Sequence, residues 1–360
     1  MSKEQINIFQ LRAIIITATI GIGIINLPRS ISMEAGTTSW LAVLLGTVFI
    51  LFAALLILKL LKYFPNHDIY EISCMITGVY FGKIIALLYV AYFVLVVSST
   101  SRFTTGTVNI WMLPLTPTKV LLVVFIGIVV FLSFHNIEVL ARFSSILLPA
   151  VVGSLILIIS SALPFIKLYN IQPIFYIDPL HLAKGVQKSF LSLFGVEMLF
   201  IFYKYVAEKK QVKQNTLLSI SFIGILYVAL TTVTIGYFGK EQLKLLVYPI
   251  VSLFKSIAIP YLIVERAELI FLLLWLSAAI TTVGIYFFSS CYLLTKIFPQ
   301  LNKGLIIAFV FGVSFYIAQA PSNIDENFKV LEFTGNVGLV PVLFIPILLL
   351  IVGKLRGVLK

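Results

Sequence analysis

The chain has 360 residues, of which 60% are hydrophobic and 11% are charged, and its mean hydropathy is +1.10. A soluble domain of this size needs more polar side chains to cover its surface, so the composition indicates an all-α, polytopic membrane protein. The net charge is +12, but lysine and arginine lie at the ends of apolar runs and not in a patch interleaved with aromatic residues. This pattern favours contact with the headgroups of the lipid bilayer and argues against nucleic-acid binding.

A helix needs about 20 mainly apolar residues to cross a bilayer. By that rule the sequence predicts about ten transmembrane helices within one integral membrane domain, residues 1–360. The first run continues beyond the length of a signal-peptide core and has no convincing cleavage site, so we interpret it as a span. The predicted spans lie near residues 12–32, 38–61, 84–108, 119–136, 143–165, 187–206, 215–238, 268–296, 304–320 and 335–353.

The first span contains Gly21 and Gly23 and ends at Asn26-Leu27-Pro28. Proline interrupts the hydrogen-bond ladder of a helix, and glycine permits unwound backbone. We therefore predict that helix 1 is broken within the membrane, at Gly21–Gly23.

Residues 68–80, between spans two and three, predict a short helix along the membrane surface. Asp68 and Glu71 have the spacing of a helix-capping pair. A metal site of His67, Asp68 and Glu71 is the less favoured alternative, because this spacing matches no metal motif.

Span three ends in the polar segment Ser98–Ser101, followed by Arg102. Hydroxyl groups within spans usually bond to backbone or neighbouring helices, which we favour over the lining of an aqueous path. Arg102 is interpreted as a headgroup contact, and its alternative role is that of a buried partner for Glu197.

The sequence Phe194-Gly195-Val196-Glu197 interrupts the apolar run of span six. An ionised carboxylate at this depth costs several kcal/mol unless it is paired or hydrated. We therefore predict a second broken helix with a functional glutamate. Glu197 has three open roles: pairing with a ligand cation, transferring protons, or holding the broken helix through internal hydrogen bonds.

The link 239–267 contains Pro249 and Pro260, and we interpret it as interfacial or re-entrant segments and not as an eleventh span. The distribution of lysine and arginine places the N-terminus inside, and an even number of spans returns the C-terminus to the same side. Lys204, Lys209, Lys210 and Lys213 form the densest basic cluster on that side.

Spans one to five (about 12–165) and six to ten (about 187–353) form two sets of five. An odd repeat length inverts the second set across the bilayer, and the two breaks then fall in the first helix of each set. Paired interruptions of this kind indicate a transporter-type binding site.

Cys74 falls in a predicted inner loop and Cys291 within a span, so a disulfide is not expected. The sequence shows no nucleophile–base set, phosphate-binding loop or metal cluster. We expect a non-enzyme without cofactor or metal.

Several segments resemble one known family. The segments are Ile20-Gly21-Ile22-Gly23 with Leu27-Pro28, Phe64-Pro65-Asn66 with Gly82-Lys83, Phe194 to Met198, Tyr248-Pro249, and Val264 to Glu268 with Trp275. They resemble the amino acid–polyamine–organocation superfamily, and more specifically the endospore germination permeases, the B subunits of nutrient germinant receptors. The position before Glu265, where the family pattern has an aromatic residue, is Val264.

This resemblance implies a LeuT-type fold with broken helices 1 and 6. It also implies a place in the spore inner membrane beside an A subunit and a lipoprotein C subunit, and sensing of a small nutrient such as an amino acid or nucleoside. The alternatives are a secondary amino-acid transporter coupled to protons or sodium, and a structural scaffold for the partner subunits.

In such a fold the half-helix ends offer N–H donors to a carboxylate and carbonyls to an ammonium group. Spans three and eight are expected to flank the site, and Tyr286 shares a helical face with Thr282. The glycines either shape the ligand site or allow close helix packing. The expected ligand-binding residues are Gly21, Ile22, Gly23, Tyr92, Val96, Phe194, Gly195, Glu197, Thr281, Thr282 and Tyr286.

Overall fold

The computed structural model describes residues 5–173, 178–257 and 266–359. Within these ranges the chain folds into helices, and the only extended pairing is an isolated bridge between Ile6 and Val206. Helices suit the predicted environment, because in hydrocarbon each backbone polar group must find its partner within the protein.

Helix 1 is broken, as predicted, but the break lies later than expected. Helix α1 (Ile8–Gly23) begins with a capping box between Asn7 and Gln10, and α2 (Leu27–Ala35) follows after three turn residues. Gly21 and Gly23 are helical, so the prediction that they form the unwound segment was wrong. Pro28 lies in the first turn of α2, where backbone N–H groups have no partner within the helix. The proline therefore removes no hydrogen bond there.

Helix 6 is also broken, at Phe194 and Gly195. Helix α9 (Pro179–Leu193) is followed by the segment Val196–Tyr205, which is bent from it by 43°. This segment comprises η3 (Val196–Met198), α10 (Leu199–Phe202) and η4 (Tyr203–Tyr205). The first half begins well before the expected position 187, because Asp178 caps its first N–H groups and Pro179 stands at its first turn.

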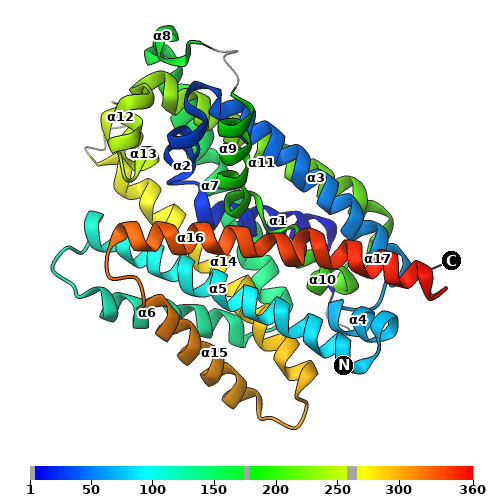
Figure 1. Cartoon of the computed structure of the whole chain (residues 1–360). Helices are drawn as coiled ribbons and strands as arrows, with labels where there is room; N and C mark the ends of the chain where they lie inside the picture. Colours follow the sequence, from blue (N-terminus) through cyan, green and yellow to red (C-terminus); the bar gives the residue numbers. More distant parts are fainter. Residues whose placement is uncertain (1–4, 174–177, 258–265, 360) are drawn as a thin grey trace.

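The other predicted spans each contain a helix of at least 16 residues, shown in Figure 1. These are α3 (Ser39–Tyr63), α5 (Val79–Trp111), α6 (Thr118–Phe134), α7 (Ile137–Ala162), α11 (Lys209–Phe238), α14 (Ala267–Ile297), α15 (Lys303–Ala318) and α16 (Ile324–Leu339), which continues through the π-helical segment Val340–Phe344 into α17 (Ile345–Leu355).

By length and composition, six described segments can cross a membrane, and a seventh is added if the bent pair counts as one span. Three shorter apolar helices, 8–21, 118–134 and 303–318, accompany them. Each of the ten regions expected from sequence therefore contains at least one apolar helix.

Short helices cover the ends of the bundle. Helix α4 (Ile69–Thr77) begins with the predicted capping box: Asp68 accepts from the Glu71 N–H (3.1 Å), and the Glu71 carboxylate accepts from the Asp68 N–H (3.1 Å). The link before span eight holds two short helices, α12 (Lys240–Leu245) and α13 (Pro249–Ser256), while Pro260 and Glu265 lie outside the described residues. The remaining short elements are η1 (Gly36–Thr38), η2 (Leu163–Phe165) and α8 (Leu168–Ile171).

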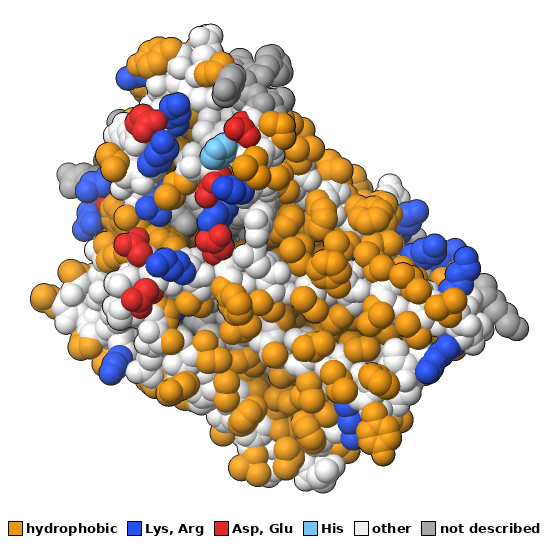
Figure 2. Space-filling model, in the orientation of Figure 1, with side chains coloured by type: hydrophobic (Ala, Val, Ile, Leu, Met, Phe, Trp, Pro, Cys, Tyr) orange, Lys and Arg blue, Asp and Glu red, His pale blue; other side chains and the backbone are white. Residues whose placement is uncertain are grey.

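The surface has the layering of a membrane protein. Figure 2 shows a wide hydrophobic area over α3, α16 and α5, with charged side chains gathered at its two ends. The described parts of both termini lie at the end that carries α4 (Figure 1). There the Ile6 N–H donates to the Tyr205 carbonyl (3.0 Å), and α17 packs on α4.

The broken helices lie inside the bundle. Helix α1 packs against α14, α7, α11 and α9, while α9 packs against α2, α3 and α16. Helices α5 and α14 pack along each other over much of their length. The fold thus surrounds both breaks with continuous helices.

Candidate functional site

A buried glutamate stands at the second break. Glu197 is 0% exposed, and its Oε2 accepts a hydrogen bond from the Gly195 N–H at 2.8 Å. That N–H is one of the donors that the interruption leaves without a helical partner. The carboxyl group therefore satisfies the backbone of its own break.

The other carboxyl oxygen binds two tyrosines from different spans. Oε1 of Glu197 accepts from the hydroxyl of Tyr286 in α14 (2.7 Å) and from that of Tyr92 in α5 (3.2 Å). The two tyrosine rings meet edge to face, with 6.3 Å between their centroids. One carboxyl group thus joins the broken helix to both of the continuous helices that flank it.

The predicted glycines are places where helices approach closely. A Cβ atom on Gly21 would lie 2.0 Å from Oγ1 of Thr282 in α14, and one on Gly23 would lie 1.7 Å from Oγ of Ser192 in α9. At Gly195, where φ is +143°, a Cβ would lie 2.7 Å from Oγ1 of Thr19 in α1. Helices α1, α9 and α14 can meet at this depth only because these positions carry no side chain.

The structure distributes the other predicted residues around this centre. The Thr282 hydroxyl donates to the Thr17 carbonyl of α1 (2.5 Å), whereas Thr281 donates to Ser277 of its own helix (2.8 Å). Phe194 and Val96 are fully buried, and Phe194 stacks on Phe190 with ring centroids 6.0 Å apart. The side chain of Ile22 lies outside the described residues.

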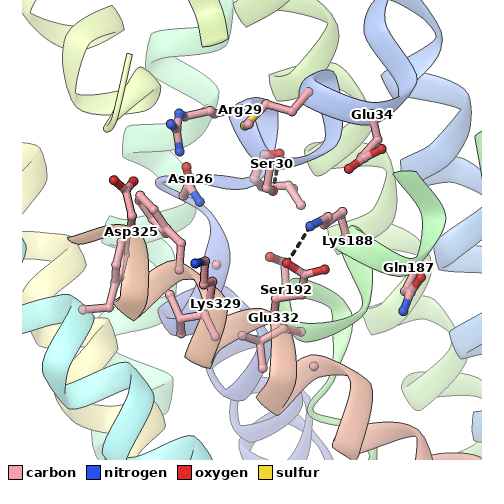
Figure 3. Close-up of a pocket in the computed structure, with 18 residues that line it drawn as sticks. Asn26, Arg29, Ser30, Glu34, Gln187, Lys188, Ser192, Asp325, Lys329 and Glu332 are labelled. Atoms are coloured by element: carbon pink, nitrogen blue, oxygen red, sulfur yellow. Dashed lines mark hydrogen bonds and ion pairs between the residues drawn. The ribbon is translucent and has the colours of Figure 1, made fainter. Parts of the chain in front are cut away.

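A cavity of about 370 Å³ that carries several charged side chains lies between α2, α9 and α16. We call it the vestibule. Gly23, Ser192 and Gly335 are among its lining residues, which connects it to both broken helices. Figure 3 shows its charged side chains converging from three elements: Arg29 and Glu34 from α2, Lys188 from α9, and Asp325, Lys329 and Glu332 from α16.

One ion pair crosses the vestibule. Nζ of Lys188 lies 2.6 Å from a carboxylate oxygen of Glu332, which joins α9 to α16 (Figure 3). Arg29 is held at the rim, where its Nε donates to the Lys244 carbonyl (3.1 Å) and its guanidinium lies 5.2 Å from the ring centre of Phe328. Both signs of charge therefore face the same space.

Comparison with known proteins gives the family. The family model described as spore germination protein matches residues 5–327. The chain belongs to this spore germination protein family.

Curated relatives support the assignment along the full length. Spore germination protein YndE of Bacillus subtilis (strain 168) is 24% identical, over 98% of this chain and 97% of that protein. Spore germination protein B2 of the same organism is 23% identical, over 91% and 89% of the two chains. Spore germination protein GerQB of Bacillus cereus is 24% identical, over 97% and 96%.

Two solved structures show the fold. MhsT in complex with L-phenylalanine has a TM-score of 0.68 at 13% identity, covering 96% of this chain and 97% of that chain. A Na⁺-coupled sialic acid symporter has a TM-score of 0.69 at 13% identity, covering 94% and 79%. The spore germination protein described here therefore has the LeuT-type fold and is a multi-pass membrane protein.

Sequence reasoning missed the vestibule of this germination protein. A signal was present in α16, where Asp325, Lys329 and Glu332 follow one another at spacings of four and three residues. Such spacing places charges on one helical face, even though the same segment continues into a span. These charges also explain why hydropathy placed the start of that span at 335 and not at 324.

The three serines at the polar end of α5 follow the favoured interpretation, whereas the Thr100 hydroxyl is buried without a hydrogen-bond partner among the described residues. Ser98, Ser99 and Ser101 each donate to a carbonyl four residues earlier, at 2.6 to 2.7 Å. Arg102 donates to the Pro321 carbonyl (3.1 Å) and, within the described residues, forms no ion pair with Glu197.

A second buried carboxylate lies at the end of the bundle that carries α4. Asp68 is 0% exposed and accepts from Nζ of Lys204 (2.8 Å) and from the Tyr292 hydroxyl (2.6 Å). Burial alone would raise the pKa of Asp68, but the charge of Lys204 and the hydrogen bonds from Lys204, Tyr292 and Glu71 outweigh it and hold the pKa below its usual value. In the described part of the chain, no cluster of His, Cys, Asp and Glu suits a metal ion here or elsewhere.

Proposed function

We propose that this germination protein is the membrane subunit of a germinant receptor and senses a small nutrient at its broken helices. Membership of the spore germination family supports the receptor role. The observation that carries the site is Glu197, because its carboxyl group binds the break and two flanking helices at once. A ligand that alters any of these bonds acts on three elements of the fold.

The chemistry of the site suits an amino acid or a nucleoside. An ammonium or ring N–H group of the ligand can replace a tyrosine hydroxyl as donor to Oε1 of Glu197. The last carbonyls of α1 offer further acceptors beside it, since they lack helical partners. The vestibule, with charges of both signs, provides a polar route to this point for a zwitterion.

The assembly and location follow the family resemblance. We place the protein in the spore inner membrane, with both termini on the core side, next to an A subunit and a lipoprotein C subunit. Its role is signalling and not enzymatic. Support comes from the common end at which the described parts of both termini lie, and from curated relatives that are themselves spore germination proteins.

The test is thermal unfolding of the detergent-solubilised chain against a panel of amino acids and nucleosides. A ligand at a hundred times its dissociation constant stabilises a folded protein by about 2.7 kcal/mol. We expect a selective rise in the unfolding temperature that Glu197→Gln weakens. Glu241→Gln is the control, since that carboxylate is exposed on α12 and outside the site. A well-folded sample that responds to no compound would argue against a complete site in this chain and favour the scaffold alternative.

A second candidate function is secondary amino-acid transport, favoured by the structural likeness to a symporter. The two functions differ in whether ligand crosses the membrane. Counterflow uptake by the isolated protein in liposomes would support transport, while binding without uptake would support a sensor.

A further inference from the structure

A second cavity lies at the inner end of the protein, away from the vestibule. It measures about 280 Å³ and lies between α6, α7, α14 and α15, at the start of α7 and the end of α14. Its polar lining includes Lys296, Lys303, His135 and Asn136. None of the described residues that line it is Asp or Glu, so the cavity is cationic.

The two lysines differ in how far they are already engaged. Lys303 lies over the ring of Phe134, with Nζ 5.7 Å from the ring centre, and forms no ion pair with any residue in the described ranges. Lys296 is shared: its Nζ lies 2.8 Å from a Glu71 oxygen and 3.9 Å from an Asp68 oxygen. The Lys303 charge is therefore the one left without an anion at the cavity.

Asn136 adds a donor to the same space. It precedes α7, yet its side chain makes no capping bond to that helix. His135 lies with Nδ1 2.9 Å from the Phe131 carbonyl, so in the neutral ring Nδ1 is the donor and Nε2 carries a lone pair. The donors to an anion are therefore the lysine ammonium groups and the Asn136 amide, which can together meet several oxygens of one anion.

The surroundings are apolar and face the lipid. Phe287 of α14 and Ile307 of α15 are among the lining residues. On the adjoining outer faces, Phe131 is 70% exposed and Phe309 is 60% exposed. An anion bound at Lys303 would thus sit beside a hydrophobic surface at the end of the spans, where lipid headgroups meet the protein.

We propose that this inner cavity binds a phosphate oxyanion, supplied by an anionic phospholipid. The phosphate lies against Lys303, with Lys296 and Asn136 around it, and the acyl chains cover the exposed faces of α6 and α15. Basic pockets between transmembrane helices on the cytoplasmic side are suited to such headgroups. This site is independent of the nutrient site, because it shares no residue with the vestibule or with the Glu197 centre.

The test measures binding of phosphatidylglycerol to the full-length chain in a neutral detergent, by native mass spectrometry and thermal unfolding. Phosphatidylcholine and inorganic phosphate serve as comparison probes. We expect Lys303→Gln to weaken phosphatidylglycerol binding about fivefold, which corresponds to about 1 kcal/mol per lysine at a membrane surface. Lys62→Gln is the matched control, since this exposed lysine also lies at the inner end of a span but outside the cavity.

Each outcome decides a part of the proposal. Preference for phosphatidylglycerol over phosphatidylcholine that depends on Lys303 and not on Lys62 supports the lipid site. Stabilisation by inorganic phosphate alone, with the same dependence, would retain the anion site and overturn the lipid as its source. Equal binding by wild type and Lys303→Gln would overturn the proposal. Lys303 is at the first turn of α15 and forms no ion pair within the described ranges, so its replacement is expected to leave the protein folded.

Discussion

Replacing Asp68 by asparagine tests the buried ion pair between Asp68 and Lys204. The substitution keeps the shape of the side chain and the ability to cap α4, because asparagine and aspartate cap helices about equally well. It removes the negative charge that faces Lys204 at 2.8 Å. The effect on the free energy of unfolding therefore reports the loss of the contacts of Oδ2 with Lys204 and Tyr292, and not the loss of the cap.

The expected magnitude follows from the burial of the two groups. Removing one partner of a buried pair destabilises a protein by about 3–5 kcal/mol. The Lys204 side chain retains 13% exposure and can partly turn towards water, so we expect about 3 kcal/mol for Asp68→Asn. Lys204→Met should lower the free energy of unfolding by at least as much. The Asp68 carboxylate, which is 0% exposed, would then have only Lys296 as a cationic partner, at 3.9 Å.

The pH dependence has a definite sign. The folded-state pKa of Asp68 is below the ordinary value of 3.8, so its contribution to stability is fully present above that pH. The contribution is lost as the pH falls through the lower, folded-state value. Between pH 7 and pH 5, Asp68 should leave stability unchanged, and a decline specific to the wild type should begin below about pH 4.

The assay is denaturant-induced unfolding in detergent micelles, followed by circular dichroism, on both single variants and on the double variant. The double variant should lose less than the sum of the two single losses, since it leaves no unpaired charge. The exposed pair Lys244–Glu241 is the control, with an expected coupling of about 0.5 kcal/mol. Additive losses for Asp68→Asn and Lys204→Met, or a loss below about 0.5 kcal/mol for Asp68→Asn, would refute the reasoning.

Gly195→Ala should destabilise the protein by at least about 1–3 kcal/mol through backbone strain alone. Gly153→Ala, at an open position inside α7, should be neutral or stabilising by up to about 1 kcal/mol. Unfolding titrations compare the two variants, and equal effects would contradict the close approach of Gly195 to Thr19. Glu197→Gln should cost about 1–3 kcal/mol in the same assay, because an amide cannot accept hydrogen bonds at both ends, and unchanged stability would exclude the described bonds. Lys188→Gln should lower the free energy of unfolding by less than about 1 kcal/mol, since the Lys188 and Glu332 side chains are 25% and 41% exposed. A loss above about 2 kcal/mol would show that the Lys188–Glu332 pair stabilises the fold.

The sequence predicted those features that are local. Long apolar runs located the spans, and the Asp68–Glu71 spacing located the capping box of α4. The pairing of glycine with Glu197 in an apolar run located the second break, because few other arrangements tolerate a carboxylate at that depth.

The features that the sequence left open depend on tertiary contacts. Helix α1 continues through Gly21 and Gly23 because each packs closely against another helix, at Thr282 and Ser192, and glycine serves close packing as readily as unwinding. The vestibule draws its charges from three distant segments, and their meeting cannot be derived from the pattern of any one of them. Hydropathy also left the first part of α16 outside a span, because Asp325, Lys329 and Glu332 made it look like a loop.

Helix α14 connects the two buried carboxylates. Tyr286 donates to Glu197 at the broken helix, and further along the same helix Tyr292 donates to Asp68 beside α4. Both hydroxyl contacts belong to one continuous helix, Ala267–Ile297. Under the proposed function, a nutrient that takes the place of the Tyr286 hydroxyl frees α14 from the break, while Tyr292 still ties the helix to Asp68. The two hydroxyl contacts are then the points through which binding at the break can act on the far end of α14.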